Sequence, residues 1–439
     1  MDVSRLGLSR ARAPQLGLGL VLLLALALRL HGIHDSLLDH PGWRQGDTAA
    51  IARNFATLDM NPLHPQTDYD GPPPNYIELE LQIVPWLAAL AYKLVGIHPV
   101  IGRLISLAFG LGTVAALFFF GRMLFASALA GLVAALAFAI YPGAIYYNRT
   151  FTPDGTMVFF LTVALLATFR WMFDDLRSGR RFAAAALLWA LAVLGKPVAA
   201  VGLLAAAAMA VERVVARPGG ASPARAPLLV RTLVFGLVAL FLAALVPYAL
   251  YDGYLRSIAE WHWASGIVRL HVLPALVVAF RSPQAFVAKL ALFRHALEML
   301  ASTMIGPVGT VIAALAVVSP VRARSRGLLW GWLAAVLLYA YVVVTVERVD
   351  YYLFLALPLA ALWTGGLAAL LAERLPRRAR ALATALGAAL AVVALLVGLA
   401  EIAPYYDDRP AVYRNAVTLS KTLAPGALVV MGHYDPSVL

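Results

Sequence analysis

Apolar runs recur along almost the whole chain, separated by short stretches rich in arginine, glycine and proline. An α-helix rises about 1.5 Å per residue, so about 20 apolar residues cross the hydrocarbon core of a bilayer. The pattern predicts an all-α polytopic membrane protein with about eleven transmembrane helices. The predicted spans cover residues 14–33, 103–119, 126–141, 154–172, 183–195, 197–211, 229–251, 300–318, 327–346, 351–371 and 381–402.

A further apolar run, residues 81–96, allows two topologies. Pro85, Tyr92 and Lys93 interrupt it, so it is either a twelfth span or a helix that lies in the membrane interface. If it lies in the interface, every cluster of arginines falls in a cytoplasmic loop, as the positive-inside rule requires. If it spans the membrane, those clusters lie on the extracytoplasmic side, against the positive-inside rule. We therefore predict an interfacial helix.

The chain divides into two parts. Residues 1–402 are predicted to form one transmembrane domain, in which residues 34–102 make the first extracytoplasmic loop with its interfacial helices. Residues 403–439 are predicted to form a short extracytoplasmic tail, with a helix around Val412 to Thr422 followed by a turn and a buried strand. No second strand follows in this sequence, so we expect either an abbreviated α/β domain or a fragment of one.

Composition supports this class and excludes others. Hydrophobic residues make up 62% of the chain and charged residues 13%. The formal net charge of +12 would suggest a nucleic-acid partner in a soluble protein, but the arginines fall in short loops between spans, so we predict none. The lipid bilayer is the predicted partner. The chain has no cysteine, which excludes disulfides, thiolate metal sites and thiol nucleophiles.

Acidic residues gather on the side that the topology makes extracytoplasmic. Most of them lie in the first loop, where Asp47 follows Arg44 and precedes Arg53 in a short amphipathic helix. Ionisable residues are costly in a membrane protein, so their clustering marks functional sites. The pattern therefore indicates a multi-pass protein with an active site on the extracytoplasmic face.

Three carboxylates stand at the outer edges of neighbouring helices. Glu80 opens the amphipathic segment after Asp47, and Asp154 starts a predicted span. If they converge, they suit a divalent cation, or one of them acts as a base beside the cation. Each also has a simpler interpretation: Asp47 and Asp154 as helix N-caps, and Glu80, like the neighbouring Glu78, as a first-turn acid that satisfies a helix dipole.

Basic and aromatic residues at the same surface suit an anionic substrate. Arg149 and Arg348 lie at the outer ends of spans, where an arginine also simply reaches the interface. Lys196 lies between two short apolar helices and needs a charge partner. With Arg348 and Tyr352 it suits a phosphate or pyrophosphate. His262, between two tryptophans, suits either sugar stacking or an interfacial anchor.

Five motifs together resemble the C-type glycosyltransferase superfamily, in the branch of protein O-mannosyltransferases and lipid A aminoarabinose transferases. They are Trp43-Arg-Gln-Gly-Asp-Thr-Ala-Ala-Ile, Glu80-Leu-Gln-Ile-Val-Pro-Trp, Arg149-Thr-Phe-Thr-Pro-Asp-Gly, Gly195-Lys-Pro and Arg348-Val-Asp-Tyr-Tyr-Leu-Phe. The resemblance covers nearly the whole membrane region, in order. It implies a helical bundle of that superfamily in a bacterial-type inner or plasma membrane. It also implies sugar transfer from a polyprenyl-phosphate donor to a glycan, lipid or protein acceptor.

The resemblance also implies roles for single residues. Asp47 matches the first-loop acid, which serves as base or positions acceptor and metal, while Glu80 and Asp154 match the other two acids. Lys196 and Arg348 fall where relatives bind the donor phosphate. The remaining predicted substrate-binding residues are Arg44, Arg149, His262, Tyr351 and Tyr352. The three acids would hold Mg²⁺ or Mn²⁺. Many relatives carry two adjacent acids in this loop, but Thr48 follows Asp47 here, which puts metal dependence in doubt.

Two other classes of function compete with a transferase. A secondary transporter of an anionic or lipid-linked solute would place ionisable residues near the midplane in repeated halves, whereas this chain places its acids at one surface. A membrane assembly or scaffold protein would account for the topology but not for the acidic cluster. The sequence therefore favours an enzyme.

Overall fold

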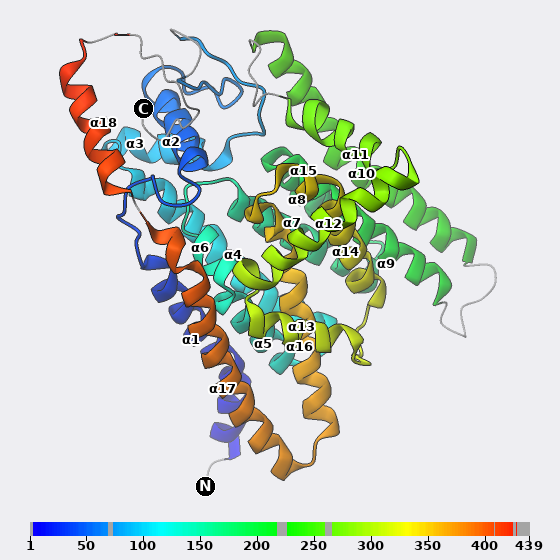
Figure 1. The fold of residues 1–439 in the computed structure, drawn as a ribbon. Helices are drawn as coiled ribbons and strands as arrows, with labels where there is room; N and C mark the ends of the chain where they lie inside the picture. Colours follow the sequence, from blue (N-terminus) through cyan, green and yellow to red (C-terminus); the bar gives the residue numbers. More distant parts are fainter. Residues whose placement is uncertain are drawn as a thin grey trace.

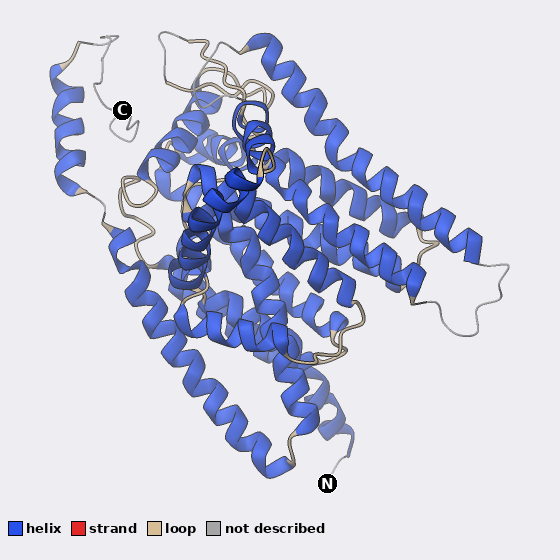
Figure 2. Cartoon of the chain, turned by 45° about the vertical axis from the view of Figure 1, so that its right-hand side comes forward, coloured by secondary structure: helices blue, strands red, loops and turns tan. Residues whose placement is uncertain are grey.

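The computed structural model describes residues 3–68, 73–216, 226–259, 266–407, 409–424 and 427. Over these residues it consists of helices and loops without a strand (Figure 2), and the β contact it holds is an isolated antiparallel bridge between Gln66 and Tyr76. The predicted all-α class is confirmed. The α-helices are α1 (Val3–Leu30), α2 (Gly42–Thr57), α3 (Ile83–Val95), α4 (Pro99–Leu124), α5 (Ala128–Ile140), α6 (Pro142–Tyr147), α7 (Asp154–Phe173), α8 (Gly179–Gly195), α9 (Leu203–Val215), α10 (Ala226–Ile258), α11 (Leu273–Ala279), α12 (Pro283–Met299), α13 (Pro307–Val318), α14 (Arg326–Tyr339), α15 (Thr345–Glu347), α16 (Leu357–Arg374), α17 (Arg377–Ile402) and α18 (Pro410–Thr422). Shorter 3-10 and π segments are η1 (Pro197–Gly202), η3 (Ile267–Val272), η4 (Leu300–Met304), η5 (Ala340–Val344), η6 (Asp350–Ala356) and η7 (Ala403–Tyr406).

Fewer of the described helices are long enough to cross a membrane than the sequence pattern predicts. Among the described residues, 8 helices are long and apolar enough to cross a membrane, or 9 if the bent pair Val268–Ala279 and Pro283–Met304 counts as one span. The predicted count of about eleven is not confirmed. Three of the predicted spans correspond to shorter helices: α5 has 13 residues, α8 has 17 and α13 has 12. At about 1.5 Å per residue each is shorter than a hydrocarbon core of about 30 Å.

Helix α5 lies inside the bundle, where it packs against α1, α4 and α16 (Figure 1). Small residues allow the close approach: a Cβ on Gly365 of α16 would lie 2.3 Å from the carbonyl oxygen of Ala130 in α5. Between helices in a membrane the hydrophobic effect supplies little force, so association relies on such close packing. Phe118 and Phe138 fill the remaining space and are buried.

The first loop lies at the end of the bundle opposite the N-terminus (Figure 1). There α2 packs against α3 and α3 against α4, around the buried side chains of Ile51, Phe55 and Val84. Helix α3 has 13 residues, which corresponds to about 20 Å at the rise of an α-helix. It is too short to be a twelfth span, in agreement with the preferred topology. Which side of the membrane this end faces stays a prediction.

The chain breaks at Lys196, as the sequence predicted. Helix α8 ends at Gly195, Lys196 has an extended backbone (φ −167°, ψ 118°), and Pro197 begins η1, which leads into α9. Proline cannot continue a helix and restricts the residue before it to extended conformations. Lys196 therefore lies in a break in the chain, between the end of α8 and the start of η1, and not within a helix.

The tail is described in part. Helix α18 coincides with the helix predicted around Val412 to Thr422. The predicted strand falls mostly on residues outside the described part of the chain. The division into residues 1–402 and 403–439 stays a prediction.

Candidate functional site

Asp47 lies inside a helix and does not cap it. Helix α2 begins at Gly42, more than a turn before Asp47, and Pro41 occupies the N-cap position without a capping side chain. The N-cap interpretation of Asp47 is therefore wrong. Its carboxylate is buried, one turn after Arg44 on the same helix.

The simpler interpretations of the other two acids also fail. Helix α3 begins at Ile83, so Glu80 precedes the helix and is not in its first turn. Asp154 is the first residue of α7, and the N-cap residue before it is Pro153, which accepts no side-chain hydrogen bond. Both carboxylates reach across to cations on other elements instead.

Arg44 forms a buried ion pair with Glu80. Burial alone would lower the pKa of the Arg44 guanidinium, but the negative charges of Glu80, Asp47 and Asp154 and the nearby Tyr351 raise it above its ordinary value. All three predicted acids thus lie close enough to influence the charge of Arg44, but the direct contact of this arginine is with Glu80.

Lys196 forms a second buried ion pair, with Oδ1 of Asp154. This pair supplies the charge partner that the sequence demanded for a lysine between two short helices. The ammonium also lies 4.7 Å from the ring centroid of Tyr352 and 5.3 Å from that of Tyr351. The other oxygen of Asp154, Oδ2, is buried and has no hydrogen-bond donor among the residues that the structure describes.

A pocket of about 470 Å³, counted with its open mouth, lies beside these pairs. It is lined by Glu78, Leu79, Glu80, Lys196, Pro197, Val198, Tyr248, Val272, Val343, Glu347 and Tyr352. A cation at its wall can hold an anionic group, and carboxylates at its wall can accept protons or hydrogen bonds from hydroxyls. We call Arg44, Glu78, Glu80, Asp154 and Lys196 the pocket cluster.

Glu78 is the member of this cluster that the predicted site residues did not include. Its side chain is 6% exposed, and its Oε2 accepts a hydrogen bond of 3.2 Å from Nη2 of Arg269 in η3. Burial and the nearby Asp252 raise the pKa of Glu78, while Arg269 and Arg256 act in the opposite direction. The available signal was the spacing Glu78-Leu-Glu80, which in an extended chain places both side chains on one side.

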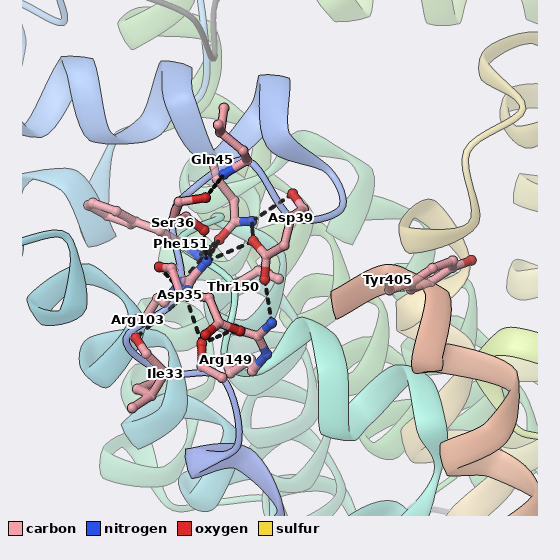
Figure 3. A network of polar contacts seen from close by, with 12 residues as sticks. Ile33, Asp35, Ser36, Asp39, Gln45, Arg103, Arg149, Thr150, Phe151 and Tyr405 are labelled. Carbon is pink, nitrogen blue, oxygen red and sulfur yellow. Dashed lines mark hydrogen bonds and ion pairs between the residues drawn. The ribbon is translucent and has the colours of Figure 1, made fainter. Parts of the chain in front are cut away.

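A second buried cluster surrounds Asp39, between α1 and α2 (Figure 3). Oδ1 of Asp39 accepts hydrogen bonds from Nη2 of Arg103 at 2.7 Å and Nε2 of Gln45 at 2.5 Å, and Oδ2 is ion-paired with Arg149. Oε1 of Gln45 accepts a bond of 3.1 Å from the backbone N–H of Phe151. We call Asp39, Gln45, Arg103 and Arg149 the Asp39 network.

Arg149 therefore lies in the Asp39 network and is fully buried there. It donates to the carbonyl oxygen of Gly32 at 2.8 Å, and its guanidinium lies over the rings of Tyr146 and Tyr406 at 4.8 and 4.5 Å. It does not reach the exposed interface in the way that a lone arginine at a span end does. Its predicted contact with substrate stays a prediction.

The remaining predicted residues are placed as follows. Tyr351 is buried and Tyr352 half-buried, both against Lys196. Arg348 is exposed, with a left-handed backbone (φ 52°), and it is not among the described residues that line the pocket. His262 lies outside the described residues.

The acids predicted to bind a divalent cation are largely engaged within the protein. Arg44 and Lys196 hold two of the three predicted ligands, Glu80 and Asp154, in ion pairs. Over the described ranges, no group of three or more histidine and acidic side chains is placed to hold a metal ion. The residues as arranged do not fit a resident cation, and Mg²⁺ or Mn²⁺ binding at Asp47, Glu80 and Asp154 stays a prediction.

Comparisons with known proteins agree with this description. Residues 82–251 match the family described as dolichyl-phosphate-mannose-protein mannosyltransferase. The sequence has no match among curated proteins. The structure is similar to ArnT from Cupriavidus metallidurans bound to undecaprenyl phosphate, with 16% identity, a TM-score of 0.54, and coverage of 95% of this chain and 83% of that chain. It is also similar to the archaeal oligosaccharyltransferase AglB from Archaeoglobus fulgidus in complex with an inhibitory peptide and a dolichol-phosphate, with 15% identity, a TM-score of 0.53, and coverage of 95% and 59%.

These likenesses show the fold. The chain is a multi-pass membrane protein with the fold of the C-type glycosyltransferase superfamily, so the resemblance seen in the sequence motifs is confirmed at this level. The matched segment 82–251 contains Asp154 and Lys196, the two partners of the second ion pair.

Proposed function

We propose that this protein is an integral membrane glycosyltransferase that moves a sugar from a polyprenyl-phosphate donor to an acceptor hydroxyl. The observation that carries the proposal is the pocket cluster: two buried cations, each neutralised by a carboxylate, beside one pocket in a C-type glycosyltransferase fold. The structurally similar ArnT binds undecaprenyl phosphate and AglB binds a dolichol-phosphate, which supports a lipid-phosphate donor here.

The chemistry assigns the cations to the leaving group. When the bond between the anomeric carbon and the phosphate oxygen breaks, negative charge grows on the lipid phosphate, and preorganised cations stabilise that charge. Lys196 lines the pocket, and Tyr351 and Tyr352 hold its ammonium in place. We assign the phosphate to Lys196, with Arg44 behind it and Arg348 at the outer edge.

In our proposal one of the three acids acts on the acceptor and the other two hold the cations. The acceptor hydroxyl must lose its proton as its oxygen attacks the anomeric carbon, and a carboxylate is a suitable base. In our proposal Asp47 either takes this proton or positions the acceptor, while Glu80 and Asp154 hold Arg44 and Lys196 in place. Direct displacement would invert the configuration at the anomeric carbon.

The proposal places the reaction at the extracytoplasmic surface of a plasma or bacterial inner membrane. The first loop, which contributes Arg44, Glu78 and Glu80 to the pocket cluster, lies at the end of the bundle opposite the N-terminus, and the arginines favour a cytoplasmic position for the other end. A hexose or pentose donor and a glycan, lipid or protein acceptor all suit this arrangement.

The test is transfer by purified protein in nanodiscs. Native mass spectrometry identifies co-purifying polyprenyl-phosphate sugars, and transfer of labelled sugar is then compared between the wild type and Asp47→Asn. We expect the variant to bind the lipid and to lose transfer by about 10²–10⁴-fold. Asp59→Asn, an exposed acid in the same loop, is the control and should retain activity.

Two results would count against the proposal. Full transfer by Asp47→Asn would remove the role given to Asp47. Wild-type protein that neither binds nor consumes a lipid-linked sugar, but moves solute across a proteoliposome membrane, would favour the secondary transporter instead.

A further inference from the structure

We propose that Glu78 takes the proton of the acceptor hydroxyl, which leaves Asp47 the task of positioning the acceptor. This inference rests on the proposed transferase function and assigns a residue that the sequence motifs do not include. It follows from which carboxylates reach the pocket and which of them are already engaged.

Glu78 has direct access to the pocket. Along the described chain the pocket is lined by Glu78, Glu80 and Glu347, together with Lys196, but not by Asp47 or Asp154. A general base must come within hydrogen-bond reach of the proton that it removes. Of the three acids at the wall, Glu347 is half-buried, whereas Glu78 and Glu80 are buried.

Two of the other carboxylates are already engaged. Glu80 is held by Arg44 in an ion pair in which both side chains are buried, and Asp154 is held by Lys196 in the same way. A carboxylate oxygen that a buried cation already occupies is less available to accept a hydrogen bond from an incoming hydroxyl. Their pairing suits them to hold the two cations in place.

Glu78 is held less firmly than Glu80 and Asp154. Its cation, Arg269, is half-exposed and contacts Oε2 only, at 3.2 Å. Its other oxygen, Oε1, is buried and has no donor among the residues with described positions. An ion pair with an exposed arginine is weak, so this carboxylate keeps the capacity to accept a proton.

The charges around Glu78 favour the same role. Asp252 on α10 opposes its ionisation, and Arg256 on α10 and Arg269 on η3 favour it. The wall of the pocket also carries Glu80, Lys196 and Glu347. Burial is the largest effect and raises the pKa of Glu78 above its ordinary value, which makes its carboxylate a stronger base.

Gly266 fixes the backbone at Glu78 and leaves room for its carboxylate. Its backbone N–H donates a hydrogen bond of 3.0 Å to the carbonyl oxygen of Glu78. The glycine has φ +67°, and a Cβ there would lie 3.0 Å from Oε1 of Glu78. A residue without a side chain is required at this point, because L-residues disfavour this conformation and a Cβ would contact the carboxylate.

The proposed step is balanced without a further reactant. The acceptor oxygen forms a bond to the anomeric carbon while the bond from that carbon to the phosphate oxygen breaks. The electron pair of the broken bond leaves with the lipid phosphate beside Lys196. The proton of the acceptor hydroxyl passes to the Glu78 carboxylate, which later releases it to water.

The experiment measures the pH dependence of kcat for purified protein in nanodiscs with a polyprenyl-phosphate sugar. Activity needs ionised Glu78, so wild-type kcat should fall as the pH is lowered through the pKa of Glu78. Glu78→Gln should lower kcat by about 10²–10⁴-fold and remove this acid limb, with little change in lipid binding. Glu78→Asp keeps a carboxylate, so it should retain part of the activity and still lose kcat as the pH is lowered.

Two further variants sharpen the test. Arg269→Gln removes a charge that favours ionisation, so the acid limb should move to higher pH while the maximal kcat changes little. Glu298→Gln, an exposed glutamate on α12, is the matched control and should leave the profile unchanged. Thermal unfolding of each variant in detergent checks that the fold is retained.

The outcomes separate this inference from the proposed function. If the wild type binds lipid phosphate and transfers sugar, but Glu78→Gln keeps the acid limb and a kcat within threefold of wild type, the assignment of Glu78 is wrong. If the wild type itself binds no lipid phosphate and transfers nothing, the transferase proposal fails before Glu78 is tested.

Discussion

The Asp39 network and the pocket cluster are made of the same kinds of side chain, yet their hydrogen bonding differs. Both oxygens of Asp39 accept from arginine, and the Gln45 amide is engaged at its nitrogen and its oxygen. In the pocket cluster, Oε1 of Glu78 and Oδ2 of Asp154 have no donor among the described residues. Burial alone therefore does not mark a reactive site. The difference lies in which acceptors remain available to a substrate.

The largest expected effect is on folding and comes from the Asp39 network. Asp39→Ala leaves Arg103 and Arg149, both fully buried, without their shared carboxylate. Removing one partner of such a buried pair costs about 3–5 kcal/mol. We expect a much lower midpoint of thermal unfolding in detergent and poor recovery of monodisperse protein. Glu78→Gln is the matched variant in the pocket cluster and should change the unfolding midpoint much less. An equal loss of stability in both variants would show that the two clusters do not differ in their structural role.

The next effect is on activity and comes from Lys196. Lys196→Met removes the cation assigned to the leaving phosphate, so transfer should fall by about 10²–10³-fold, the usual cost of losing a charge-stabilising group. Lys196→Arg should recover part of the rate because it keeps the charge. Lys93→Met, an exposed lysine on α3, serves as the control. Transfer close to wild type in Lys196→Met would exclude the phosphate assignment.

A smaller effect is expected from the aromatic ring that faces this ammonium. Tyr352→Leu removes the ring whose centroid lies 4.7 Å from Nζ of Lys196. A contact of this kind is worth about 0.5–2 kcal/mol, so KM for the lipid-linked donor should rise severalfold while the fold is retained. Tyr413→Leu, on the exposed face of α18, should not change KM. An unchanged KM in Tyr352→Leu would show that this tyrosine does not contribute to donor binding.

The smallest effect concerns metal ions. Glu80 and Asp154 are each held by a cation of the protein itself, so these carboxylates have little need of a divalent ion. We expect EDTA to change transfer by less than about twofold in an assay with a chelator-washed sample. Loss of activity that added Mn²⁺ or Mg²⁺ restores would show that the acids rearrange around a metal, as the resemblance implied.

The elements of the site were predictable from local sequence. The break at Lys196 follows from the proline after it, and the short helix α3 follows from its amphipathic pattern. Helix α2 was predicted to be amphipathic, but it buries polar side chains such as Arg44 and Gln45 as well as apolar ones. The need of Lys196 for a counter-charge followed from its apolar surroundings. These features depend on neighbouring residues, which a sequence displays directly.

The pairing of charges was not predictable in the same way. Arg149 and Asp154 lie in one motif, yet Arg149 pairs with Asp39 and Asp154 with Lys196. Which arginine meets which acid is set by the packing of α4, α7 and α8 around the first loop, over long separations in the chain. The start of α2 was also misplaced, because Asp47 is a good capping residue by type while the helix begins after Pro41.

Consecutive residues of α2 serve the two clusters. Arg44 pairs with Glu80 and Gln45 joins the Asp39 network, and successive residues of an α-helix point about 100° apart. A single inserted or deleted residue at the start of α2 would therefore rotate the arginine away from its acid and the glutamine away from its network together. Among homologues this helix is expected to vary in composition but to keep its length, so that the stretch from Pro41 to Asp47 aligns without gaps.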